Sequence, residues 1–147
     1  MAPESLQFEH RELREHLDKA VAAPGRTGEA AREVVKVLQP HILLETEFAM
    51  PPLTLLPKLA RGEVTPDMAR FIDKTDAFKA ELPRMLDEHK LIVGTLRTLL
   101  QAATAEKVPV AAQFAQKMIM HAQMEEEVLY PAAILVGEYL RLRMGKG

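Results

Sequence analysis

The sequence predicts an all-α fold, and two observations support this expectation. Helix-forming residues, chiefly Ala, Leu, Glu, Lys, Arg, Gln and Met, dominate the chain, whereas Val, Ile, Thr and aromatic residues nowhere alternate with polar ones as they do in a strand. Clusters of Pro and Gly divide the chain at residues 23–28, 61–66 and 107–109. These breaks predict four helical stretches.

The third predicted stretch has the clearest start. Thr65, Pro66 and Asp67 have the form of an N-cap, an N1 proline and an acidic first turn. The four predicted stretches cover residues 3–21, 27–50, 66–105 and 109–144.

Prolines inside the stretches lack a backbone donor and are expected to bend or end the helices. We expect Pro40 to kink the second stretch, and Pro51 with Pro52 to stop it. Pro83 and Pro131 are expected to break or bend the third and the fourth stretch.

The composition excludes several classes of protein. The 147 residues suffice for one domain, and 19 Lys and Arg against 21 Asp and Glu give a net charge of −2, so we expect no nucleic-acid partner. The chain is 48% apolar but has no run long enough to span a membrane. The lack of cysteine excludes thiolate metal ligands and, with an acidic N-terminus that has no apolar signal core, favours a cytoplasmic protein.

Each predicted helix carries a stripe of apolar residues at helical spacing with a histidine in its middle. A single histidine on an apolar face is usually a core residue that bonds to the backbone, but four of them require another explanation. The stripes are Leu6, Leu13 and Leu17 with His10; Val34, Val37, Leu44 and Phe48 with His41; Leu82, Met85, Ile92, Leu96 and Leu99 with His89; and Phe114, Met118 and Val128 with His121.

The second half of the chain repeats the first. The pair Glu-His at residues 9–10 recurs at 88–89, and the pattern His-x-x-x-Glu at residues 41–45 recurs at 121–125. Each half is therefore a predicted helical hairpin that has one histidine on its first helix and a His-x-x-x-Glu pair on its second.

The half-repeats cover about residues 3–60 and 83–145. If Pro83 marks the entry of the third bundle helix, residues 65–82 form an extra helical segment between the hairpins.

The repeated residues predict a metal centre. His41 and Glu45, like His121 and Glu125, are four residues apart and share one face of a helix. Two hairpins packed face to face would bring four imidazoles and two carboxylates to one level of the core, where the carboxylates need a cation to stay ionised. A set without thiolates favours two iron ions, with manganese or zinc as alternatives. The candidate ligands are His10, His41, Glu45, His89, His121 and Glu125.

This spaced set resembles the hemerythrin-like, His-His-Glu cation-binding family, and the resemblance covers about the whole chain as two copies of the family's half-repeat. Ferritin-like di-iron bundles use Glu-x-x-His, the reverse order, and fit less well. The resemblance implies an up-down-up-down four-helix bundle with a non-haem di-iron centre. It also implies that His10 and His41 bind one iron, that His89 and His121 bind the other, and that Glu45 and Glu125 bridge them.

Some residues depart from the family pattern or lie near it. Oxygen-carrying members have a further histidine four residues after the third-helix histidine, where this chain has Val93. His16 lies about 120° round the helix from His10 and is expected on the surface. Tyr130 lies about 180° round the helix from the fourth-helix histidine and is expected to be structural. Glu126, directly after Glu125, is a further carboxylate that could reach a metal.

The function predicted from these residues is that of a di-iron protein that handles O₂, peroxide, NO or iron itself. Sensing, scavenging or iron homeostasis is favoured over oxygen storage because Val93 supplies no ligand. Two alternatives stay open: a di-metal oxidase or peroxidase with turnover, and a metal-free structural bundle. The expected partner is a small diatomic or peroxide ligand, and an apolar outer face on residues 53–59 would suit a homodimer.

Overall fold

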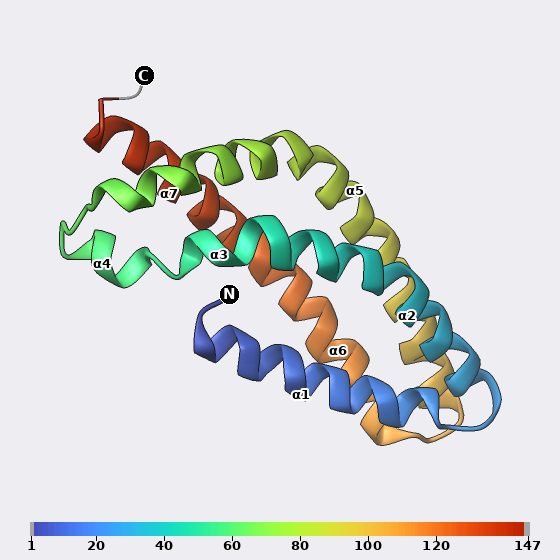
Figure 1. Cartoon of the computed structure of the whole chain (residues 1–147). Coiled ribbons are helices and arrows are strands. Elements are labelled where there is room, and N and C mark those ends of the chain that lie inside the picture. Colours follow the sequence, from blue (N-terminus) through green and yellow to red (C-terminus); the bar gives the residue numbers. More distant parts are fainter. Residues whose placement is uncertain (1, 146–147) are drawn as a thin grey trace.

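The structure is a computed structural model that describes residues 2–145, so both ends of the predicted single domain, residues 1–147, lie outside the described part. The described residues form helices and no strand, which confirms the all-α prediction. The first hairpin consists of α1 (Glu4–Val21) and α2 (Gly25–Leu44). The second consists of α5 (Arg70–Ala105) and α6 (Pro109–Met124), which α7 (Tyr130–Arg143) continues (Figure 1).

Short elements extend and join these helices. A π-helical turn, η1 (Glu45–Ala49), carries α2 into α3 (Met50–Leu53), and a second, η3 (Glu125–Leu129), carries α6 into α7. Between the hairpins lie α4 (Leu56–Ala60) and the 3₁₀ turn η2 (Pro66–Ala69).

The long helices form the up-down-up-down bundle that the sequence predicts. Within residues 2–145, α1 packs beside α2 and α6, and α5 packs beside α2, α6 and α7. Successive helices run in opposite directions (Figure 1). All four helical runs therefore pack around one common axis.

Two apolar clusters fill that axis and leave a polar layer between them. One cluster lies towards the α1–α2 and α5–α6 connections and includes Leu96 and Phe114. The other includes Phe78, Met85 and Tyr130. The four stripe histidines fall between the two clusters in sequence, so apolar side chains shield both sides of the polar layer.

Two of the internal prolines, of which Pro40 was expected to kink its helix and Pro83 to break or bend its helix, lie within continuous helices. α2 runs through Pro40, and the 36-residue α5 runs through Pro83. A proline removes one hydrogen bond, which the remaining bonds of a long, packed helix can carry. Residues 70–82 are therefore the first part of α5 and not a separate segment, and only the preceding turn η2 stands apart.

The two π-helical turns sit at matching places of the repeat. The N–H of Tyr130 bonds to the carbonyl of Glu125, five residues back, and the N–H of Met50 bonds to the carbonyl of Glu45. A proline, Pro51 or Pro131, is the second residue after each turn and has no N–H for a regular α-helical bond. Each turn thus inserts one residue and rotates the helix after it by about 100°.

The inserted residue reverses two expectations for the fourth helical run. Val128, predicted in the core stripe, is 55% exposed, whereas Tyr130 is fully buried. The predicted apolar stripe assumes a rotation of 100° per residue, and this rotation does not hold across the π turn η3.

Two close contacts fix the ends of the bundle. The carboxylate of Glu106, in the α5–α6 connection, accepts hydrogen bonds from the backbone N–H (2.7 Å) and hydroxyl (2.6 Å) of Thr27 in the first turn of α2. At the other end α5 and α7 approach so closely that a Cβ at Gly137 would overlap the hydroxyl of Thr75.

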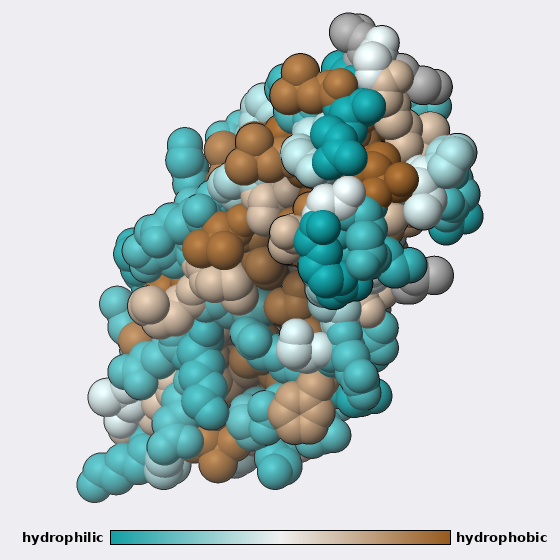
Figure 2. Space-filling view, turned by 90° about the vertical axis from the view of Figure 1, so that its left-hand side faces the viewer, coloured by the Kyte–Doolittle hydropathy of each residue, from teal (hydrophilic) through white to brown (hydrophobic). Residues whose placement is uncertain are grey.

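The apolar face expected on residues 53–59 is mostly covered by the chain itself. Leu53 and Leu59 are buried, whereas Leu56 is exposed. The surface at this end of the bundle mixes apolar patches with hydrophilic side chains (Figure 2). The homodimer stays a prediction. None of the helices within residues 2–145 combines the length and apolar character needed to cross a membrane.

Candidate metal centre

All six predicted ligands meet in the polar layer, each on a different element. Five of them are at most 4% exposed, and His10 is 26% exposed. They are His10 on α1, His41 on α2, Glu45 on η1, His89 on α5, His121 on α6 and Glu125 on η3.

The donor atoms form two groups that share both carboxylates. Among the described residues, one group combines Glu45 and Glu125 with His10 and His121, and the other combines the same two carboxylates with His41 and His89. The donor atoms within a group lie within 4.8 Å of one another. The arrangement suits two ions side by side with two bridging carboxylates.

The histidines pair differently from the expectation, which joined His10 to His41 and His89 to His121. Nε2 of His41 lies 2.8 Å from Nε2 of His89, and Nε2 of His10 lies 3.3 Å from Nε2 of His121. The reason is that α1 neighbours α6 as well as α2, and α2 neighbours α5. Each pair therefore joins the two hairpins and does not lie within one.

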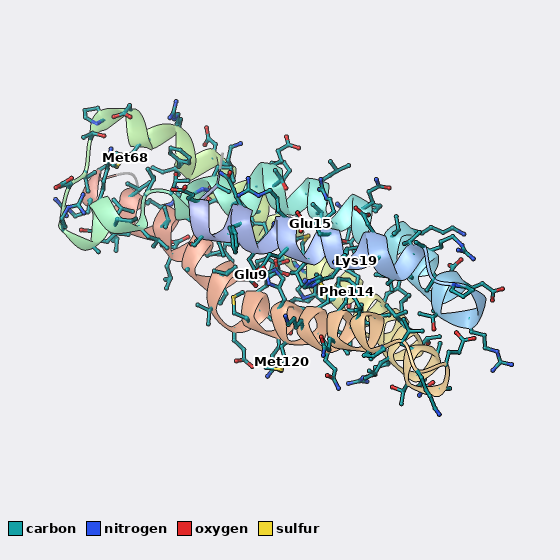
Figure 3. The ribbon with its side chains drawn as sticks, turned by 90° about the horizontal axis from the view of Figure 1, so that it is seen from below. Glu9, Glu15, Lys19, Met68, Phe114 and Met120 are labelled. Carbon is teal, nitrogen blue, oxygen red and sulfur yellow. The ribbon has the colours of Figure 1, made fainter. Side chains whose placement is uncertain are left out.

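Carboxylates from neighbouring helices orient three of the imidazoles through Nδ1. The pairs are His41 with Glu88 (3.1 Å), His89 with Glu126 (3.0 Å) and His121 with Glu9. Figure 3 shows Glu9 between α1 and α6, with Met120 pointing away from that space. An Nδ1–H donated to such a carboxylate leaves the Nε2 lone pair directed into the centre, as in metal sites.

Sequence reasoning missed Glu9 and Glu88, although each precedes a ligand histidine in the repeated pair Glu-His. Glu126, considered as a metal-reaching carboxylate, instead contacts His89 from outside.

The donor set fits a cation. The Nε2 atoms of His41 and His89 lie 2.8 Å apart. With their protons on Nδ1, the two imidazoles would direct their Nε2 lone pairs at each other. Glu125 Oε2 is buried and accepts no hydrogen bond from residues 2–145, although His121 Nε2 lies 3.2 Å away. Donors bound at about 2.1 Å and at right angles to one ion lie about 3 Å apart, which matches this spacing.

Electrostatics favour the same conclusion. Burial and the charge of Glu125 raise the pKa of Glu45 well above its usual value. Burial also opposes ionisation of Glu125, but its contacts with imidazoles, His121 first, lower its pKa. Burial lowers the pKa of His10 and of His41. Without a cation the two carboxyls cannot both be ionised, whereas a divalent ion allows it.

Tyr130 lies inside the centre and not on the opposite side of the helix, where its spacing from His121 predicts it. Its hydroxyl donates to Glu45 Oε2 (2.8 Å), lies 3.0 Å from Nε2 of both His41 and His89, and lies 3.4 Å from Glu125 Oε1. Because the π turn η3 adds one residue, Tyr130 lies on the same face of the helix as Glu125, five positions earlier. The proline that follows Tyr130 is the sequence feature that indicates such a turn.

A cavity of about 140 Å³ reaches the centre between α1, α2 and α6. It has room for a few water molecules or a diatomic ligand. Its lining includes both members of the His10–His121 pair but neither His89 nor Tyr130. The lining residues are His10, Leu13, Arg14, Leu17, Leu38, His41, Ile42, Glu45, Thr46, Phe114, Met118, His121 and Glu125.

Two further residues lie outside the donor groups. His16 belongs to neither group, and its side chain is partly buried where an exposed position was expected. Val93, four residues after His89, is half-buried and has no donor atom.

Comparison with known proteins agrees with this geometry. The family described as the hemerythrin HHE cation binding domain matches residues 1–133, a span that contains all six candidate ligands. No curated protein and no solved structure matches the chain. The chain therefore belongs to the hemerythrin HHE cation-binding family.

Proposed function

We propose that the chain binds two iron ions, one between His10 and His121 and one between His41 and His89, with Glu45 and Glu125 bridging. The observation that carries the proposal is that both carboxylates belong to both four-donor groups. Manganese and zinc are the other ions that such a His and carboxylate set accepts.

Iron held in this way would bind a small molecule such as O₂, peroxide or NO and exchange electrons with it. The surrounding residues hold three of the four imidazoles through Nδ1, shield the centre with two apolar clusters, and admit a small ligand through the cavity. Val93 adds no histidine donor. We therefore place the protein in oxidant or NO sensing, scavenging or iron handling, and not in oxygen storage.

A metal-free structural bundle is the weaker alternative. It would leave Glu125 Oε2 buried without a hydrogen bond and would set the lone pairs of His41 and His89 against each other. Buried polar groups of this kind are costly when nothing satisfies them.

Iron content after anaerobic loading with ferrous iron tests the proposal. Wild-type protein should bind two ions per chain. Glu45→Ala and Glu125→Ala should each lose both ions because each carboxylate is shared, whereas His10→Ala should mainly weaken one. His16→Ala is the control and should keep two. Unchanged iron content in both glutamate variants would refute the bridging assignment.

Exposure to O₂ tests the kind of function. Reduced, iron-loaded protein is mixed with O₂ in a stopped-flow spectrometer and then returned to argon. Oxidation that persists under argon agrees with sensing, scavenging or iron handling, and catalytic consumption of peroxide would identify the enzyme alternative. A spectrum that reverts to the reduced form would show an oxygen carrier and contradict the proposal.

A further inference from the structure

The two metal positions differ, although the sequence repeat relates them. Tyr130 follows η3 and is fully buried beside His41 and His89. The matching residue of the first half is Met50, which follows η1 and has no oxygen donor. The repeat thus supplies a phenol on one side of the centre and a thioether in the equivalent place.

The hydroxyl of Tyr130 has the spacing of a ligand. It lies 2.8 to 3.4 Å from one donor atom of each of the four residues in the His41–His89 group. Donors of one ion, each about 2.1 Å from it and at right angles, are about 3 Å apart. The hydroxyl therefore lies next to a donor atom of every residue in this group, as a further ligand of the same ion would.

We propose that Tyr130 is a direct ligand of the iron held by His41 and His89, so that external small ligands bind only at the iron held by His10 and His121. This inference rests on the proposed di-iron function. The bond formed joins the phenolic oxygen to iron, and the hydroxyl proton leaves to solvent, with no electron transferred. Tyrosine is an established type of iron ligand in proteins.

The cavity independently marks the His10–His121 side as the open one. Its lining includes both of these histidines but only His41 of the other pair, and it excludes Tyr130 and His89. His10 is 26% exposed, whereas His89 is 2% exposed. A small ligand that enters through the cavity therefore meets the His10–His121 position first.

The carboxylates around the centre show the same asymmetry. Glu126 contacts Nδ1 of His89, and the matching position of the repeat is Thr46, which lines the cavity. No carboxylate within residues 2–145 forms an ion pair with Nδ1 of His10. His10 is thus the least restrained ligand, which suits the position where ligands exchange.

The test uses the two tyrosines of the chain as a matched pair. Tyr130→Phe removes the hydroxyl and keeps the ring that packs edge-on against Phe78, with centroids 5.2 Å apart. Tyr139→Phe makes the same change near the end of α7, where the hydroxyl bonds to Arg143. Both variants should fold and bind two irons.

The readout is the spectrum of the ferric protein. Wild type and Tyr139→Phe should show a visible phenolate-to-iron charge-transfer band, with phenolate vibrations enhanced in the resonance Raman spectrum, and Tyr130→Phe should lose both. In an azide titration, wild type should bind one equivalent per iron pair, and Tyr130→Phe should bind two because the second iron becomes open.

The outcomes separate this inference from the function on which it rests. Wild-type protein that binds two irons without a phenolate band, or a band that survives in Tyr130→Phe, would overturn the inference and leave the di-iron centre intact. Equal azide stoichiometry in wild type and Tyr130→Phe would overturn it as well. Failure of the wild type to bind iron would overturn both.

Discussion

Replacing Glu45 by glutamine should stabilise the metal-free protein while it abolishes metal binding. Glutamine keeps the shape of the side chain and an oxygen that accepts the Tyr130 hydrogen bond, 2.8 Å long in the wild type. It removes only the ability to ionise. Because burial raises the pKa of Glu45, the folded protein holds a proton there over a pH range in which the unfolded chain has lost it.

The size of the effect follows from proton linkage. A group whose pKa is raised on folding stabilises the fold fully below its unfolded pKa, here 4.5, and loses that contribution as the pH rises towards the folded value. Each pH unit of that range costs about 1.4 kcal/mol. Between about pH 5 and 7, the unfolding free energy of the wild type should therefore fall relative to Glu45→Gln by up to about 1.4 kcal/mol per pH unit.

Urea denaturation of chelator-treated proteins at three pH values in this range measures the difference. Glu47→Gln is the control because Glu47 lies on the same π turn but is exposed, so its pH dependence should follow the wild type. Adding ferrous iron should stabilise the wild type, by about 2.7 kcal/mol at one hundred times the dissociation constant, and leave Glu45→Gln unchanged. Parallel pH dependences for metal-free wild type and Glu45→Gln would refute the reasoning.

Three further predictions concern other contacts. Gly137→Ala should lower the unfolding free energy by about 1–3 kcal/mol in thermal or urea denaturation, because its Cβ would meet the Thr75 hydroxyl; an unchanged stability would show that α5 and α7 separate freely. Glu106→Gln should lower the melting temperature at neutral pH, and the difference should shrink as acid titrates Glu106, whose pKa is lowered chiefly by its hydrogen bond from a threonine hydroxyl on α2. Glu88→Gln should weaken iron binding about 10- to 100-fold in a chelator competition, because it loosens His41; wild-type affinity would show that this carboxylate does not orient the ligand.

The sequence predicted the bundle and its six convergent residues because both depend on regular helical geometry. The four-residue spacing of His41 and Glu45 places them on one face in any α-helix, and Gly and Pro mark the connections. Which histidines pair across the core depends on how neighbouring helices pack, and spacing within one helix carries no such information. The donor groups in the structure therefore combine the histidines differently from the expected pairs, although all six predicted residues do meet.

Tyr130 shows where the periodicity itself misleads. A rotation of 100° per residue holds only while each N–H bonds four residues back, and η3 bonds five back. The proline after Tyr130 hints at an irregular turn, but a proline at the same distance from a histidine also fits an ordinary helix end. Glu88 was overlooked for a related reason, since its role depends on a histidine of another helix.

Because each histidine pair joins one hairpin to the other, ions bound at this centre would cross-link the two hairpins. Each donor group takes one histidine and one glutamate from each hairpin, and the paired histidines are 111 and 48 positions apart in the chain. An ion bound there closes a long loop, as a disulfide does, in a chain that has no cysteine. Loading then cross-links the two hairpins in the middle of the bundle. After release of the ions, side-chain packing, hydrogen bonds such as the one between Thr27 and Glu106, and the connection that contains α4 and η2 still hold one hairpin against the other.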